Sequence, residues 1–164
     1  FGIPFDRNGA LAKKNMANEK ALLSMLSHKY FNYPIPKSTG FETFNLKWIN
    51  KYISKFNIKN KNTLIATITQ LTIISISDAI NSSNLDSSDI FFSGGGSRNS
   101  FIKNNILKRT GLNEVKVLPF ELNYKNLESA SFAWLAMKRN NNEKIAKKYI
   151  TGANRSRKLG IIYR

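Results

Sequence analysis

The sequence predicts an α/β fold in which mostly parallel strands are packed by helices, with a helix-rich N-terminal part. Three observations support this prediction. Apolar residues recur at helical spacing through the first half of the chain, two short apolar runs alternate with helical patterns in the second half, and three consecutive glycines follow the first of these runs. The order strand, helix, strand, helix implies parallel strands joined by a right-handed crossover.

The N-terminal part is predicted to hold two helices separated by a loop. Asn18 is a suitable cap for the first helix, in which Leu22, Met25 and Leu26 share one face. The loop covers residues 33–40 (YPIPKSTG), where two prolines and a glycine interrupt regular structure. The second helix is predicted to be amphipathic and to turn an aromatic stripe toward the core: Phe41, Phe44, Trp48, Tyr52 and Phe56.

The next segment, TLIATITQLTIISISDAI, is predicted to be a buried helix that opens at Asn62 or Thr63. Its β-branched residues would also suit a strand, but the segment is too long for a strand without a turn signal. We identify no signal peptide and no apolar stretch that approaches the roughly 20 residues of a membrane span. A polar turn is expected at residues 83–89.

The first strand is predicted at Ile90–Ser93, directly before the three glycines. Ser97 or Asn99 is placed to cap the helix that follows, and Gly111 fits the C-terminal cap of that helix. These signals indicate a strand, a glycine loop and a helix in immediate succession.

The second strand is predicted at residues 114–120, where Val115 and Val117 alternate with other residues. A short helix follows at residues 127–139. Three small residues on this helix would allow it to lie close against a sheet: Ala130, Ala133 and Ala136.

Composition narrows the possible functions. The absence of cysteine excludes a disulfide framework and thiolate chemistry, and the single histidine, His28, argues against a zinc site. The net charge of +16 makes nucleic acid the first partner to consider. However, the basic residues are scattered, and a richness in Lys, Asn and Ile is typical of an AT-rich coding sequence. We therefore favour no nucleic-acid partner, with a basic nucleic-acid-binding domain as an alternative.

The glycine run is the strongest candidate site. Gly94, Gly95 and Gly96 lie at the carboxyl end of a predicted strand, where ligands gather in parallel α/β units. The helix that follows offers unpaired N–H groups and the positive end of its dipole. Arg98 is placed to stack on a base or pair with phosphate, and Asn99 to hydrogen-bond a ribose or a base edge. The alternative is a tight turn without a ligand, because the run matches neither standard phosphate-loop motif.

Glu128 is the one carboxylate that stands apart from the polar segments. It opens an alanine-rich, largely apolar helix directly after a predicted strand and loop. A carboxylate in the first turn of a helix is favoured by the dipole whether or not it binds a ligand. Both interpretations, helix capping and ligand contact, remain open from the residues alone.

Several segments along the whole chain carry a pattern in fixed order: Lys29–Trp48, Gly94–Phe101, Glu128–Ala136, and Thr151–Ala153 followed by Leu159 and Gly160. They are similar to the motifs PYF…PKSTGREYFN…W, GGGSRNPL, EALAFAWLA and TGA…LG of the anhydro-N-acetylmuramic acid kinase family. The opening FGIPFDRNGALA also resembles the G…YDKDG segment of that family. Each motif alone is weak, but their collinear order makes the resemblance specific.

The resemblance implies the actin, sugar-kinase and Hsp70-like (ASKHA) architecture, in which two RNase H-like lobes close over ATP. Residues 1–164 would be the C-terminal lobe, with a helical segment at 1–60 that includes the PKSTG loop and an α/β nucleotide-side subdomain at 61–164. The implied reaction uses ATP and Mg²⁺ to open and 6-phosphorylate 1,6-anhydro-N-acetylmuramic acid in cell-wall recycling. The implied setting is the bacterial cytoplasm, with a homodimer as the complete enzyme and no membrane partner.

The resemblance also assigns residues. Gly94, Gly95, Gly96, Arg98 and Asn99 fall on the adenosine-side glycine loop of the family, which makes them the expected nucleotide-binding residues.

Two further assignments concern the sugar side and a signature loop. Glu128 falls on a glutamate associated with the sugar side of the cleft, and no residue is assigned to a metal. A signature loop without an assigned role contains Lys37, Ser38 and Thr39.

The family's N-terminal phosphate loop and its DTGPGN segment, which carries the catalytic aspartate, have no counterpart in these residues, and Asp6 is not assigned that role. Because the chain starts at Phe1 and lacks these segments, we expect a preceding lobe to be missing. The isolated chain is therefore expected to be inactive. The alternative is a non-catalytic remnant of a decayed or split kinase gene.

Overall fold

The computed structural model describes residues 1–35, 37–83, 89–116, 122–123, 125–146 and 152–163. Over these residues the chain is α/β and helix-rich with a small parallel sheet, which confirms the predicted fold class at this coarse level. Contacts divide the chain into two compact units. The first unit comprises Phe1–Tyr33 and Thr39–Val115, and the second comprises Pro34–Ser38 and Lys116–Arg164.

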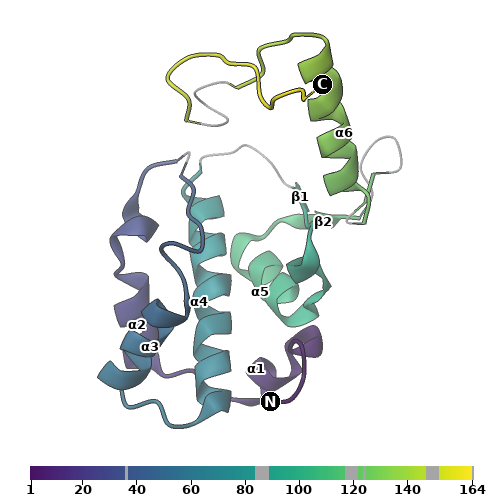
Figure 1. Ribbon diagram of the computed structural model, residues 1–164. Helices are drawn as coiled ribbons and strands as arrows, with labels where there is room; N and C mark the ends of the chain where they lie inside the picture. The colour runs from purple at the N-terminus through teal and green to yellow at the C-terminus, as the bar shows by residue number, and fades with distance from the viewer. Residues whose placement is uncertain (36, 84–88, 117–121, 124, 147–151, 164) are drawn as a thin grey trace. The chain divides into compact units, whose positions relative to one another are not determined.

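The long helix α4 (Lys61–Asn81) organises the first unit (Figure 1). Its cap is Asn60, whose side chain accepts a hydrogen bond from the Asn62 N–H at 2.8 Å, so the helix opens slightly earlier than predicted. Three helices pack against it: α1 (Ala10–Lys14), α2 (Glu19–Leu26) and α5 (Ser100–Thr110). The main buried cluster consists of Leu22 and Met25 of α2, Leu71 of α4, and Tyr52 from a further helix, α3 (Leu46–Lys55).

Helix α4 also corrects one expectation, because among the described residues it is long and apolar enough to cross a membrane by length and composition. It has 21 residues, and the mean hydropathy of its apolar window is 1.5. In the structure it packs against other helices of its unit. Its fully buried Thr67 accepts a hydrogen bond from the Asn18 N–H at 2.9 Å and donates one to the Thr63 carbonyl at 2.7 Å. These contacts hold one side of α4 against the unit. Only 28% of its apolar window is buried, so α4 is less buried than its sequence predicts.

The predicted cap of α2 is confirmed. The Asn18 side chain accepts a hydrogen bond from the Ala21 N–H at 3.0 Å, which satisfies one of the unpaired N–H groups of the first turn. Leu22 and Met25 are buried, as their spacing predicts.

The aromatic helix is shorter than predicted. Helix α3 (Leu46–Lys55) begins after Asn45, whose side chain accepts a hydrogen bond from the Trp48 N–H at 3.0 Å. Phe41 and Phe44 therefore precede the helix, and Phe41 is 80% exposed. Phe44 still joins the aromatic cluster: its ring centroid lies 5.0 Å from that of Trp48, and it stacks on Phe31. Phe31 belongs to a short 3₁₀ helix, η2 (Lys29–Asn32).

The two strands pair in parallel, as predicted. Strand β1 (Asp89–Phe91) pairs with β2 (Asn113–Val115), and the register places Ile90 opposite Glu114. Helix α5 connects them. A 2.7 Å ion pair between Lys103 of α5 and Glu114 of β2 links this helix to the sheet.

The predicted caps of α5 are also confirmed. Asn99 accepts a hydrogen bond from the Ile102 N–H at 3.1 Å, and Gly111 ends the helix with φ 71°. The C-terminal part of the predicted second strand, which includes Val117, lies outside the described residues, as does most of the predicted polar turn at 83–89.

The second unit contains helix α6 (Leu127–Asn140), which is close to its predicted bounds. None of its described residues is buried, so the packing of its alanines against a sheet stays a prediction. Lys138 in the last turn of α6 pairs with Glu143 beyond the helix at 2.8 Å, and this hydrogen bond lowers the pKa of the Glu143 carboxyl. An antiparallel bridge joins Ala146 to Arg157.

Candidate functional site

The first glycine of the run has a conformational reason to be glycine. Gly94 has φ 78° and ψ −179°, a region that essentially only glycine adopts. The turn is closed by Ser97, whose hydroxyl donates to the Gly94 carbonyl at 2.7 Å. A 3₁₀ helix, η3 (Gly95–Arg98), follows and leads into α5.

The next two glycines have no such reason. Gly95 and Gly96 do not have positive φ angles, and a Cβ built on either would meet no atom within 4 Å. Neither the local conformation nor the packing of the chain therefore requires glycine at these positions. The main chain is left bare toward open space, which is the arrangement that lets a ligand approach the backbone.

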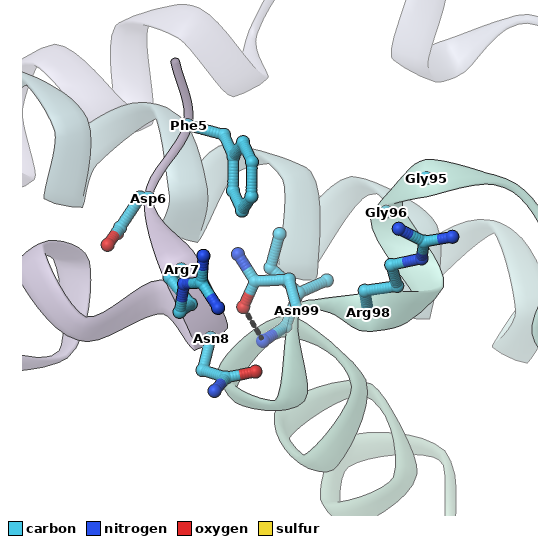
Figure 2. A pocket seen from close by; sticks show the side chains of 9 residues that line it. Phe5, Asp6, Arg7, Asn8, Gly95, Gly96, Arg98 and Asn99 are labelled. Atoms are coloured by element: carbon cyan, nitrogen blue, oxygen red, sulfur yellow. Dashed lines mark hydrogen bonds between the residues drawn. The ribbon is translucent and has the colours of Figure 1, made fainter. Parts of the chain in front are cut away.

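This open backbone lines a cavity of about 710 Å³ within the first unit (Figure 2). One wall is formed by residues 5–8, at the start of the chain. The other wall carries Gly95, Gly96, Arg98, Asn99 and Ile102. The volume falls in the usual range of small-molecule sites. The structure thus brings four of the predicted nucleotide-site residues to one cavity, and Gly94 leads directly into it.

Hydrogen-bond donors dominate the polar lining of this cavity. Arg7 and Arg98 are exposed cations. The Asn99 Oδ1 atom already accepts a hydrogen bond from the Ile102 N–H, and the side-chain N–H₂ of Asn99 is a further donor. The carboxylate of Asp6 accepts hydrogen bonds from the Leu11 and Ala12 N–H groups at 2.9 and 3.0 Å. A lining of this kind suits a ligand that is anionic and rich in acceptors.

Residues 5–8 were not assigned to a site from the sequence. A signal was present, because the opening segment resembles a family motif and contains Gly9. In the structure Gly9 is buried with φ 69°, and a Cβ there would lie 2.6 Å from the Phe101 Cβ and 2.7 Å from the Asn99 Oδ1. Gly9 therefore allows the short helix η1 (Arg7–Gly9) to rest directly on the N-terminus of α5.

The other predicted site residues lie elsewhere. Glu128 is exposed in the first turn of α6, where the helix dipole favours a carboxylate. It belongs to the second unit, as do Lys37 and Ser38, whereas Thr39 belongs to the first. Lys37 is half-buried, and Ser38 and Thr39 are exposed. Their assigned roles stay predictions.

Among the described residues, no group of three or more His, Cys, Asp or Glu side chains is placed to hold a metal ion. The second unit has its own, apolar cavity of about 490 Å³ along α6, lined in part by Leu127, Trp134 and Leu135. Of these two cavities, the one at the glycine loop combines charged donors with bare main chain.

Comparison with known proteins gives one consistent result. The model of the anhydro-N-acetylmuramic acid kinase family matches residues 1–164. Relatives that carry this name include one from Sulfurovum sp., 34% identical over 163 residues, one from Haemophilus influenzae, 34% identical over 178 residues, and one from Shewanella halifaxensis, 34% identical over 164 residues. The three alignments cover 98%, 99% and 98% of this chain, in that order. They cover only 44%, 46% and 43% of the length of the relatives. The chain thus spans less than half the length of these relatives.

Proposed function

The chain belongs to the anhydro-N-acetylmuramic acid kinase family, and from this premise we propose that it forms the C-terminal, nucleotide-side lobe of such a kinase. We assign it the RNase H-like architecture of the ASKHA superfamily, with a helical segment at 1–60 and an α/β subdomain at 61–164. The collinear family motifs and the parallel strands flanking a glycine loop support this assignment.

The proposed reaction is the ATP-dependent opening and 6-phosphorylation of 1,6-anhydro-N-acetylmuramic acid. Within it, this chain binds the nucleotide through Gly94, Gly95, Gly96, Arg98 and Asn99. The single observation that carries this role is the open space over Gly95 and Gly96 in a cavity lined by two arginines. There a ligand can rest against main-chain N–H groups while Arg98 pairs with a phosphate or stacks on the base.

Other parts of the proposal rest on the family alone. Glu128 would contact the sugar, and the loop at Lys37, Ser38 and Thr39 would belong to the closed cleft. Mg²⁺ would accompany the phosphates, but the described residues offer no carboxylate cluster for it, so we assign no residue of this chain to the metal. The complete enzyme would be a homodimer in the bacterial cytoplasm.

We further propose that the chain alone does not turn over substrate. Phosphoryl transfer depends on positioning and charge stabilisation on both sides of a closed cleft. General-base activation of water needs a carboxylate within about 3 Å of that water. Asp6, the carboxylate in the lining of this cavity, already accepts two backbone hydrogen bonds.

The test is a phosphorylation assay with ATP, Mg²⁺ and the anhydro sugar, run with the chain alone and with the separately produced N-terminal part of the Sulfurovum relative. We expect turnover only in the mixture, and we expect Arg98→Ala to lower it. Turnover by the chain alone would contradict the proposal that both lobes are needed. A mixture that stays inactive, although both parts are folded, would favour the non-catalytic remnant instead.

A further inference from the structure

The cavity wall opposite the glycine loop contains an aromatic ring without an assigned role. Phe5 is 62% exposed, although burial of a phenylalanine ring is favourable. Single exposed aromatic residues are common. This one, however, lies in a concave wall that faces bare main chain, where an exposed ring offers a flat apolar surface to a ligand.

The segment that carries Phe5 is held in place by two sets of contacts. The Asp6 carboxylate accepts hydrogen bonds from two N–H groups of α1. Gly9 packs against Phe101 and Asn99 at the N-terminus of α5. Because Asn99 also ends the glycine loop and caps α5, the ring of Phe5 and the backbone of Gly95 and Gly96 are positioned by the same short structural unit.

Arg7 adds a charge to this wall. Its guanidinium lies 5.8 Å from the centroid of the Phe5 ring, within the range of a cation–π contact. Figure 2 shows the Phe5 ring, the Arg7 guanidinium and the Asn99 amide around the same space, whereas the Asp6 carboxylate points away from them. The wall therefore combines a flat apolar face with hydrogen-bond donors.

We propose that Phe5 and Arg7 form the base platform of the nucleotide site: the nucleobase stacks on Phe5 and faces the backbone of Gly95 and Gly96, with Arg7 donating to acceptor atoms of the nucleoside. This proposal rests on the nucleotide site proposed above. The platform would make that site specific for a nucleotide over a simple phosphate. A nucleotide fits this wall because it has a flat π face, acceptor atoms at its edge and negative charge.

The test compares the binding of ATP and of inorganic tripolyphosphate, which lacks a base, to the full 164-residue chain by calorimetry. Phe5→Ala should weaken ATP binding by about 5- to 140-fold, the range expected for loss of base–aromatic stacking. It should leave tripolyphosphate binding unchanged. Phe41→Ala is the matched control, because Phe41 is also exposed in the first unit but does not line the cavity.

Phe5→Trp provides a second measurement that does not depend on the alanine variant. The new indole should be quenched by ATP and not by tripolyphosphate, after subtraction of the wild-type signal from Trp48 and Trp134. If the wild type binds ATP but Phe5→Ala binds it equally well, the platform is refuted while the nucleotide site stands. If the folded wild type binds no ATP, both the site and its platform are refuted.

Discussion

Two glycines near the cavity should respond in opposite ways to the same substitution. At Gly9, alanine would have to adopt φ 69° and to place its Cβ 2.6 Å from the Phe101 Cβ. The left-handed conformation costs a non-glycine residue about 1–2 kcal/mol, and overpacking costs about 1–3 kcal/mol. Gly9→Ala should therefore lower the free energy of unfolding by about 2–5 kcal/mol.

At Gly95 the same change meets no atom within 4 Å and no positive φ. Alanine at a compatible position reduces the freedom of the unfolded chain and raises stability by about 0.4–1 kcal/mol. The added methyl group would nevertheless stand between the main chain and the ligand. Gly95→Ala should therefore be as stable as the wild type or slightly more stable, and should bind ATP more weakly.

Chemical denaturation followed by circular dichroism measures both stabilities, and calorimetry measures the ATP affinity of each folded variant. We assign Gly9 to packing and Gly95 to ligand binding. Loss of as much stability in Gly95→Ala as in Gly9→Ala, or full ATP affinity in Gly95→Ala, would refute this assignment.

Two further predictions concern Asn99 and Glu143. Asn99→Ala removes the cap of α5 and should cost about 1 kcal/mol of stability. Asn99→Asp should restore the cap and the stability in denaturation, but not ATP binding, because it replaces a donor with a carboxylate; restored binding would contradict the donor role. Because the pKa of Glu143 is lowered in the folded chain, its ionised carboxyl stabilises the fold at a pH above its ordinary pKa of 4.5. This contribution is lost as the pH falls through the lowered pKa. An NMR titration should place the Glu143 midpoint below 4.5 and Lys138→Met should raise it; an equal midpoint in both would contradict the contact.

Local signals in the sequence were sufficient to predict the caps of α2 and α5. Asn18, Asn99 and Gly111 act as predicted because capping depends on side-chain and backbone geometry within one turn. The start of α3 was predicted wrongly because Phe41 and Phe44 continue the helical spacing although Asn45 begins the helix. Phe44 reaches the aromatic cluster from outside the helix, so its spacing reflects tertiary packing and not helical geometry.

The candidate site was predictable only on one side. The glycine loop could be predicted as a candidate site because it follows a predicted strand, and the structure confirms that position. The opposite wall comes from residues 5–8, about ninety positions earlier in the chain. The packing of Gly9 on α5 and the hydrogen bonds of Asp6 to α1 hold it there. Such long-range contacts leave no periodic signal in the sequence.

The most direct test of the nucleotide site is a titration of the isotopically labelled chain with ATP, followed by NMR at individual backbone amides. We predict saturable shifts centred on Gly94, Gly95, Gly96 and Asn99, and weaker shifts in Arg98→Ala. A folded chain whose glycine-loop amides do not respond to ATP, or whose saturable shifts centre on another part of the chain, would contradict it.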